Sequence, residues 1–284
     1  MITIVGKPGQ LGNSLFLFAN FIACAIEHDL KIADPAFDEY AQYFKTTGRD
    51  FFCRYPARKS LLSGNRWTRK LFFSLNYYAA RLLVRSGVKT GLVRAIAIDW
   101  DESVRLDSEG FLEVAARTRL LYVQGWQFRD HTNFTRHADK IRAYFEPLDL
   151  FQHNVERLIE HARSSCDLLV GVHIRHGDYR KYLNGKYFYE VDQYARVMER
   201  VERLYPDKRV GFLICSNARL SASDFARFNF TFGNDHLIED MYSFARCDLL
   251  LGPPSTYTMW ASFYGQVPLY MIEDINAEPR FAHA

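Results

Sequence analysis

Residues 168–179 read LLVGVHIRHGDY, an apolar strand that ends abruptly in a dense cluster of polar side chains. Side chains alternate along an extended chain, so His173 and Arg175 share one face while Ile174 points to the other. In a parallel α/β sheet, ligands bind at the carboxyl ends of the strands. Arg175 is permanently charged and planar, so it can hold a diphosphate through two parallel hydrogen bonds. Asp178 follows closely enough to brace Arg175; the alternative is a surface turn with incidental charges.

A regular alternation of helices and strands surrounds this strand. The pattern predicts helices at 150–163, 187–204, 237–246 and 256–264, with strands at 168–173, 210–215, 228–232, 248–251 and 267–271. Strands and helices that alternate at this spacing indicate a parallel α/β sheet.

The chain opens with a second series of the same kind. The pattern predicts strands at 2–5, 30–33 and 120–123, and helices at 14–28 and 137–145. Residues 6–12, GKPGQLG, form a glycine loop before the first helix, whose N-cap we expect to be Asn13. Backbone amides at such a helix end can meet a phosphate. The two series join near Pro147 and predict an α/β protein of two Rossmann-like domains facing a cleft, residues 1–148 and 149–284.

The composition is that of a globular protein with a sizeable core, since 48% of the 284 residues are hydrophobic and 24% are charged. The net charge is +3 and no Lys/Arg tract stands out, which gives no case for nucleic acid. The five cysteines are odd in number and lack zinc-site spacing, which favours buried thiols in a reducing compartment. No secretory signal precedes the first strand, and the longest apolar run, 15–26, is too short to span a bilayer. We therefore expect a cytoplasmic protein.

Between residues 36 and 118 the periodicity is weak except at 66–85. Apolar residues recur there at spacings of three and four among several Lys and Arg residues, namely Leu71, Phe72, Leu75, Tyr78, Leu82 and Leu83. A basic amphipathic helix of this kind can lie as a peripheral contact on an anionic membrane, or pack as a surface helix on its own domain. Both readings remain open at this point.

Four segments carry a resemblance to a known family. The motif HIRHGDY at 173–179 resembles the hallmark of the fucosyltransferase superfamily, which includes bacterial α-1,2-, α-1,6- and protein O-fucosyltransferases. Three further segments agree with that family in order: GQLGNSLF at 9–16, VQGWQ at 123–127, and EDMYSFARCD at 239–248 followed by GPPSTYTMWA at 252–261. His176 stands where many members have a second Arg, Ser216 and Asn217 stand where the α-1,2 enzymes usually have two aspartates, and Met259 replaces a common Trp. These departures leave the acceptor and the linkage open.

The resemblance implies a GT-B-type glycosyltransferase that transfers fucose from GDP-fucose to a glycan hydroxyl, with inversion and without a metal. An α-1,2 linkage is the option that it suggests. The expected cytoplasmic location without a secretory signal suggests a bacterial surface polysaccharide or lipopolysaccharide as the acceptor. Residues 1–148 would serve the acceptor and residues 149–284 the donor. GDP-fucose is then a donor substrate, and no cofactor is expected.

The resemblance also implies site residues, with Arg175 as the catalytic residue that grips the β-phosphate. The implied donor contacts are His173 and Asp240 at the guanine, Ser255 and Thr256 at the phosphates, Asp178 beside Arg175, and Gly12 and Asn13 across the cleft. Plain structural roles are the alternative, because Ser255 and Thr256 can be helix caps and Asp240 a first-turn acid. Asp34, Asp130 and Asp178 are candidates for the general base, with a structural role as the alternative for each.

Two motifs favour other chemistry. The opening glycine loop also resembles NADP-dependent short-chain reductases that act on nucleotide sugars, and Tyr182 and Lys186 have the spacing of that family's catalytic pair. The Asn-Gly between them is turn chemistry, which would not stack the two side chains on a helix. Asp99 and Asp101 flank Trp100 after an apolar run, an arrangement that holds a metal diphosphate in other glycosyltransferases. A different nucleotide-sugar transferase and a non-catalytic sugar-binding protein also remain as alternatives.

Overall fold

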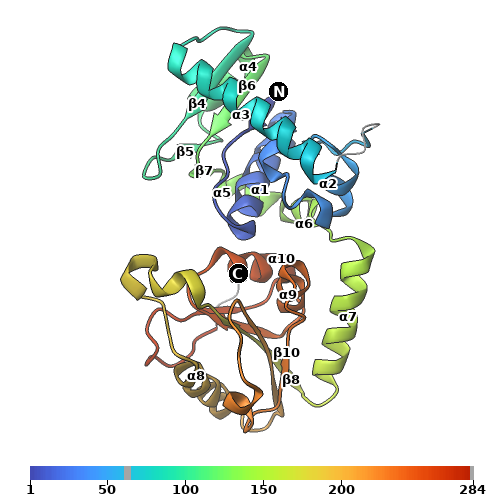
Figure 1. The fold of residues 1–284 in the computed structure, drawn as a ribbon, viewed down its shortest axis with the longest axis vertical. Coiled ribbons are helices and arrows are strands. Elements are labelled where there is room, and N and C mark those ends of the chain that lie inside the picture. Colours follow the sequence, from blue (N-terminus) through green and yellow to red (C-terminus); the bar gives the residue numbers. More distant parts are fainter. Residues whose placement is uncertain (61–64, 282–284) are drawn as a thin grey trace. The chain divides into compact units, whose positions relative to one another are not determined.

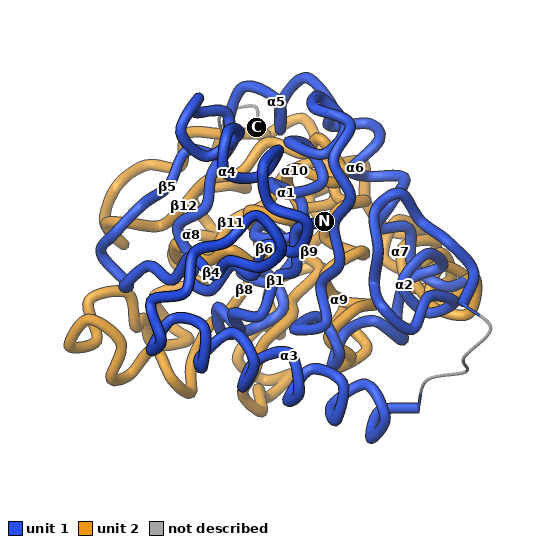
Figure 2. The backbone as a smooth tube through the Cα atoms, turned by 90° about the horizontal axis from the view of Figure 1, so that it is seen from above, with its two compact units in different colours: residues 1–148 blue, residues 149–284 orange. Residues whose placement is uncertain are grey.

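The computed structural model describes residues 1–60 and 65–281. The chain divides into two compact units, Met1–Leu148 and Asp149–Ala284 (Figure 2). Each unit contains a five-stranded sheet and its own helices (Figure 1). The α/β class predicted from the alternation of strands and helices is confirmed.

The sheet of unit 1 has the strand order β3-β2-β1-β6-β4. Strands β1 (Ile2–Ile4), β2 (Ile32–Ala33), β6 (Leu120–Gln124) and β4 (Val93–Ala97) are parallel, whereas the edge strand β3 (Arg54–Tyr55) is antiparallel to β2. Strands β5 (Val104–Arg105) and β7 (Phe128–Arg129) form a separate parallel pair. The helices are α1 (Leu11–His28), α2 (Lys45–Arg49), α3 (Arg66–Ser86), α4 (Glu109–Arg117), α5 (His131–Arg136) and α6 (Ala138–Tyr144), with 3-10 helices η1 (Pro35–Phe37) and η2 (Ala41–Tyr43).

Helix α1 is the core helix of unit 1. It is long and apolar enough in composition to cross a membrane, but 72% of that stretch is buried inside the protein, as expected of a core helix. The prediction that Asn13 caps it is wrong: Gln10 is the N-cap and the helix begins at Leu11. Gly12 and Asn13 therefore lie inside the first turn. The Asn13 amide donates to the carbonyl of Pro8 at 2.9 Å, so this side chain holds the preceding glycine loop.

The sheet of unit 2 has the strand order β10-β9-β8-β11-β12, and all its strands are parallel. They are β8 (Leu168–Ile174), β9 (Val210–Ser216), β10 (Phe230–Phe232), β11 (Leu249–Gly252) and β12 (Leu269–Met271). The helices are α7 (Asp149–Arg163), α8 (Val191–Leu204), α9 (Leu237–Phe244) and α10 (Thr256–Gly265), with 3-10 helices η3 (Gly177–Arg180), η4 (Tyr182–Gly185) and η5 (Ala222–Phe225).

Strand β8 lies at the centre of this sheet, and all seven of its residues are buried. Val170 and Val172 point into the core that α8 covers. The opposite face carries Gly171, where a Cβ would come within 2.6 Å of Phe244 in α9. Glycine therefore lets α9 pack close to the strand, next to the side chain of His173, whose ring lies 6.0 Å from that of Phe244.

Element boundaries in unit 2 follow local backbone chemistry. Helix α8 begins at Val191, four residues later than predicted, because Glu190 and Gln193 form a reciprocal capping box there. The Tyr182–Gly185 segment is a 3-10 turn in which Leu183 and Asn184 have φ of 48° and 57°. A left-handed pair inside this motif separates Tyr182 from Lys186, so the two side chains do not share an α-helical face. Tyr182 and Lys186 therefore lack the geometry of the catalytic pair of a short-chain reductase.

Candidate active site

The carboxyl ends of the unit 2 strands converge on one site. From β8 the chain moves outward to β9 and β10 on one side, and then returns to place β11 and β12 on the other. This reversal of strand order creates a switch point beside β8, which is where open α/β sheets bind ligands.

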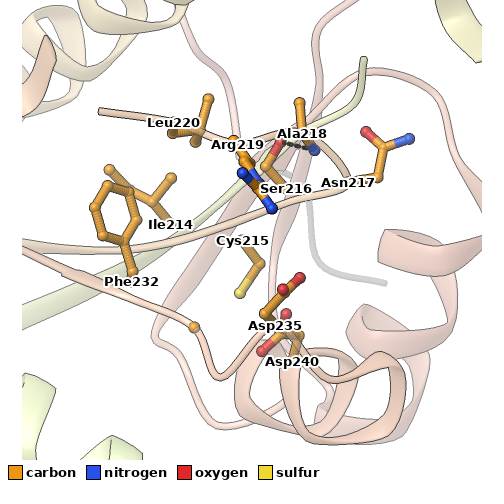
Figure 3. A pocket seen from close by; sticks show the side chains of 11 residues that line it. Ile214, Cys215, Ser216, Asn217, Ala218, Arg219, Leu220, Phe232, Asp235 and Asp240 are labelled. Atoms are coloured by element: carbon orange, nitrogen blue, oxygen red, sulfur yellow. Dashed lines mark hydrogen bonds between the residues drawn. The ribbon is translucent and has the colours of Figure 1, made fainter. Parts of the chain in front are cut away.

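Two adjoining pockets lie at these strand ends, of about 290 and 190 Å³. They share Cys215, Ser216, Asn217, Asp235 and Asp240, so we treat them as one site, the strand-end pocket. The larger part adds Ile214, Ala218, Arg219, Leu220, Phe232 and Gly233; the smaller adds His173, Arg175, His236, Leu237 and Tyr257. In Figure 3 the carboxylates of Asp235 and Asp240 lie together at one end, with Cys215 between them and the loop that carries Ser216 and Arg219.

Arg175 enters the smaller part of this pocket directly after β8. Its guanidinium donates to Asp178 at 3.0 Å and lies 5.3 Å from the ring centre of Tyr179. Only 12% of the Arg175 side chain is exposed, against 52% for Asp178. Asp178 therefore braces the arginine, as the sequence predicted, and is not among the residues that line the pocket.

His173 lies on the same face of β8 as Arg175 and also lines the pocket. Burial, and secondarily the charge of Arg175, lower the pKa of His173 to about 3, so the imidazole is neutral at physiological pH. Its Nδ1 is buried and finds no hydrogen-bond partner within the described residues. Buried polar atoms are nearly always hydrogen-bonded, so this nitrogen is placed for a ligand.

Asp240 reaches the pocket from the first turn of α9 and lines both of its parts. Burial raises its pKa to about 6, although the backbone amide of Asn234 donates to its Oδ1 at 2.8 Å. Gly233 makes this fit possible, because a Cβ there would come within 2.5 Å of the carboxylate. The site thus holds a carboxylate that is costly to bury without a partner.

The predicted phosphate contacts lie at the start of α10. Ser255 is the N-cap of this helix and its Oγ accepts from the amide of Tyr257 at 3.2 Å. Thr256 is the first helical residue. Neither side chain lines the pocket, whereas Tyr257 does. A helix N-terminus still presents amides and a positive dipole end toward an anion.

The other predicted residues belong to unit 1 and are not among the residues that line this pocket. Gly12 and Asn13 belong to unit 1, in the first turn of α1. Asp34 is buried and caps η1 through the amide of Phe37, and Asp130 caps α5 through the amide of Asn133. Both therefore fill the structural role that was the alternative to a general base.

Several pocket residues were not assigned to the site by the sequence reasoning, which singled out Ser216 and Asn217 only as departures from the α-1,2 pattern. Asn217 holds the loop after β8, since its Oδ1 accepts from the amide of His176 at 2.8 Å. Cys215 and Ser216 end β9, and Asp235 follows β10 in a left-handed conformation with φ of 54°. The rule that ligands bind at strand ends, applied to β9 and β10 as well as to β8, would have found them.

A second cavity, of about 360 Å³, lies within unit 1 and is lined by aromatic side chains. We call it the aromatic groove; it is lined by Gly6, Lys7, Pro8, Phe73, Tyr77, Ile98, Asp99, Trp100, Gln124, Gly125 and Trp126. The indoles of Trp100 and Trp126 are stacked, 6.3 Å apart with 18° between their planes. Arg129 lies over Trp126 at 4.1 Å and donates to its carbonyl at 2.7 Å, which fixes that ring.

Among residues 1–60 and 65–281, no three His, Cys, Asp or Glu side chains are grouped so that they could hold a metal ion. Asp99 and Asp101 lie in the turn after β4, where Glu102 accepts from the amide of Asp99 at 2.9 Å.

Comparisons with known proteins point to one kind of fold. No family model matches the sequence, and no curated protein sequence does so. A mutant of Arabidopsis thaliana FUT1 in complex with GDP matches with a TM-score of 0.63 and 15% identity, over 95% of this chain and 70% of that one. The NodZ α-1,6-fucosyltransferase co-crystallised with GDP matches with a TM-score of 0.56 and 15% identity, over 99% and 98%. POFUT1 in complex with GDP matches with a TM-score of 0.54 and 10% identity, over 94% of each chain. The chain therefore has the fold of these fucosyltransferases.

Proposed function

We propose that this protein transfers fucose from GDP-fucose to a hydroxyl of a glycan acceptor. The observation that carries the proposal is the convergence of His173, Arg175 and Asp240 on one pocket at the switch point of a parallel sheet. The resemblance of the motif at 173–179 and the fold likeness to fucosyltransferases bound to GDP support the same reading.

Arg175 stabilises the leaving group in the proposed reaction. The acceptor oxygen attacks C1 of fucose from the face opposite the diphosphate, and the bond from C1 to the β-phosphate oxygen breaks. The electron pair leaves with GDP, and the acceptor proton passes to a base. Negative charge grows on the β-phosphate during this step, and a fixed guanidinium in a pocket of low solvent access is suited to stabilise it.

Asp240 supplies the selectivity for guanine. Its carboxylate can accept from the N1–H and the exocyclic amine of guanine, a pair of donors that neither adenine nor uracil presents in that arrangement. Pairing with these donors offsets the cost of burying the charge. The neutral His173 has a buried nitrogen without a partner among the described residues, which supplies one more directional contact.

The aromatic groove of unit 1 is suited to the acceptor. The C–H face of a pyranose packs on an indole ring, and the groove presents two, while Asp99 and Gln124 offer hydrogen-bond acceptors for hydroxyls. Such apolar walls with a few polar groups are typical of small-ligand sites. The groove also lies at the carboxyl ends of β1, β4 and β6.

Trp100→Ala should raise the KM for the glycan acceptor about tenfold and leave the affinity for GDP unchanged. Loss of one aromatic stacking surface costs roughly 1 kcal/mol or slightly more. Trp67→Ala is the matched control, since Trp67 is 79% exposed and does not line the groove, and Trp100 is 69% exposed. Initial rates against acceptor concentration measure the change; an equal rise in KM in both variants would remove the groove from the proposal.

The two main alternatives predict different ligands. Another nucleotide-sugar transferase of the same fold would bind a different donor. A short-chain reductase would bind NADPH, but the Tyr182–Gly185 turn lacks the helical geometry that this chemistry needs. We therefore test GDP, UDP, ADP and NADPH by calorimetric titration against the wild-type protein.

Binding of GDP, with UDP, ADP and NADPH at least about 30-fold weaker, is the expected result, because only guanine satisfies Asp240. Preference for UDP or NADPH would replace the proposal by the corresponding alternative. No binding of any nucleotide would overturn it. Transfer assays with GDP-fucose and GDP-mannose then establish the sugar.

A further inference from the structure

Helix α3 is held to unit 1 by one face. The buried guanidinium of Arg69 donates to backbone carbonyls between positions 47 and 51, namely those of Thr47, Gly48, Asp50 and Phe51. Farther along, Ala80 packs with Val5 and Tyr122. These contacts fix the orientation of the whole helix, so its opposite face has a defined position (Figure 1).

That opposite face carries an exposed apolar stripe. Its residues are Trp67, Leu71, Leu75, Tyr78 and Leu82, which are 79%, 62%, 62%, 61% and 66% exposed. Successive spacings of four, four, three and four residues place them along one side of the helix. We call this set the α3 outer face. Single exposed apolar residues are ordinary on a protein surface, but a continuous row along 16 residues of a fixed helix indicates a binding surface.

The charge distribution around α3 is strongly one-sided. Residues 51–98 contain ten of the chain's 36 Lys and Arg residues and none of its 33 Asp and Glu residues. The remainder of the chain therefore has a net charge of −7, although the whole chain is only at +3. The asymmetry is hidden when only runs of basic residues are counted, because the cations are dispersed among apolar side chains.

The exposed cations of α3 flank the apolar stripe. Arg66, Lys70, Arg81 and Arg85 are all exposed, and at 100° per residue Lys70, Arg81 and Arg85 fall at one edge of the stripe. Helix α3 contains no acidic residue. The result is an apolar strip bordered by positive charge, with an aromatic ring near its start and another past its middle.

We propose that the α3 outer face binds the surface of an anionic lipid bilayer. The helix lies parallel to the membrane plane, its leucines enter the boundary between headgroups and acyl chains, and its cations meet anionic headgroups. Trp67 and Tyr78 suit this depth, because amphipathic rings concentrate at membrane interfaces. The inference concerns unit 1 alone and does not rest on the proposed function.

A bilayer fits these observations better than two other partners. A second copy of the chain would bring together two segments with a net charge of +10 each, which repel one another. A nucleic acid would meet the cations, but Leu71, Leu75 and Leu82 offer nothing to phosphates, and they occupy the most exposed line of the helix. An anionic bilayer satisfies the charge and the apolar stripe together.

The test is flotation of the full-length protein with vesicles of phosphatidylcholine, with or without 30% phosphatidylglycerol. One variant combines Leu71→Gln, Leu75→Gln and Leu82→Gln; a second combines Lys70→Gln, Arg81→Gln and Arg85→Gln. Leu150→Gln is the matched control, because Leu150 is an equally exposed leucine (66%) in α7 of unit 2. Thermal melting checks that each variant is folded.

We expect the wild type and Leu150→Gln to float with the anionic vesicles and not with the neutral ones. Each cation near an anionic surface strengthens binding about fivefold, so the charge variant should bind about a hundredfold more weakly, and added salt should weaken the wild type. The apolar variant should lose binding to a similar degree. On mixing with anionic vesicles, the fluorescence of Trp67 should shift to the blue in the wild type and in Leu150→Gln, but not in the other two variants. Equal flotation of all proteins would overturn the proposal. Self-association through this face, or binding of RNA without binding of vesicles, would also overturn it.

Discussion

Arg175→Ala is expected to lower the turnover of fucosyl transfer by about two to four orders of magnitude, the scale of losing a preorganised charge stabiliser. Arg175 is the cation that lines the smaller, more buried part of the strand-end pocket, and its side chain is only 12% exposed. It is held in place by Asp178 before any ligand binds, so little reorganisation is needed when the leaving group develops charge. Stopped assays of GDP release and product formation measure the effect.

Two further variants make this result specific. Arg175→Lys keeps the charge but loses the planar pair of donors, so we expect an intermediate rate. Arg180→Ala removes a neighbouring arginine that lies 4.3 Å from the ring of Phe188 and does not line the pocket, so turnover should stay within about twofold of wild type. Removal of Arg175 leaves Asp178, half exposed and solvated, so the fold should persist. Near wild-type turnover of Arg175→Ala would refute its assignment as the catalytic residue.

The part of the site around β8 could be predicted because its signals are local. A strand whose seven residues are all buried reads as a continuous apolar run, and its end is marked by the switch to HIRHGDY. Alternation along the strand then placed His173 and Arg175 on one face, where the structure has them. Asp240 was predicted as a site residue only from the family resemblance, because an acid in the first turn of a helix is common for electrostatic reasons alone.

The region from 36 to 118 resisted prediction because distant contacts hold it together. The short helix α2 ends where Arg69, some twenty residues later, donates to its carbonyls. Strand β3 has two residues and exists only through its antiparallel pairing with β2. Neither feature leaves a periodic pattern, and Asn13 was misplaced as a cap because Gln10 caps α1 without a side-chain hydrogen bond.

The basic helix at 66–85 shows a second limit of predicting structure from apolar periodicity. The apolar spacing predicted the position of α3 correctly, but it did not distinguish the apolar residues that face the protein from those that face outward. Phe72 packs against Phe51 and Phe52 on the inner side, with tilted and edge-to-face rings, whereas Leu71 and Leu75 are exposed. The sequence shows which residues of the helix are hydrophobic. Which of them face outward is decided by the packing of Arg69 and Ala80 against the rest of unit 1.

Asp240→Asn is expected to abolish useful GDP affinity and, at the same time, to stabilise the protein without ligand. The carboxylate is buried with a raised pKa of about 6, so its charged form opposes folding. Asparagine keeps an oxygen for the amide of Asn234 but carries no charge, so the free energy of unfolding should rise by about 2 kcal/mol at pH 8. Two hydrogen bonds from guanine to a charged acceptor are lost, which should weaken GDP binding about a hundredfold or more.

The gain in unfolding free energy expected for Asp240→Asn changes with pH in a defined direction. Above pH 6 the native wild-type carboxyl is ionised and the full cost is present, so the advantage of asparagine is greatest there. As the pH falls through about 6, the native carboxyl takes up a proton that the unfolded chain, with an ordinary pKa of 3.8, does not, and the advantage shrinks. The affinity of the wild type for GDP should decline over the same range, because a protonated carboxyl cannot accept from both donors of guanine.

Asp235→Asn is the matched control for this experiment. Asp235 lines the same pocket but is exposed, and its left-handed backbone, with φ of 54°, is one that asparagine adopts readily. We expect its unfolding free energy to stay within about 0.5 kcal/mol of wild type at both pH values. Urea unfolding at pH 8 and pH 5, with and without GDP, separates the two variants. If Asp240→Asn were destabilising at pH 8, or still bound GDP as tightly as wild type, the carboxylate would be a structural group of α9, and guanine would be read by other residues.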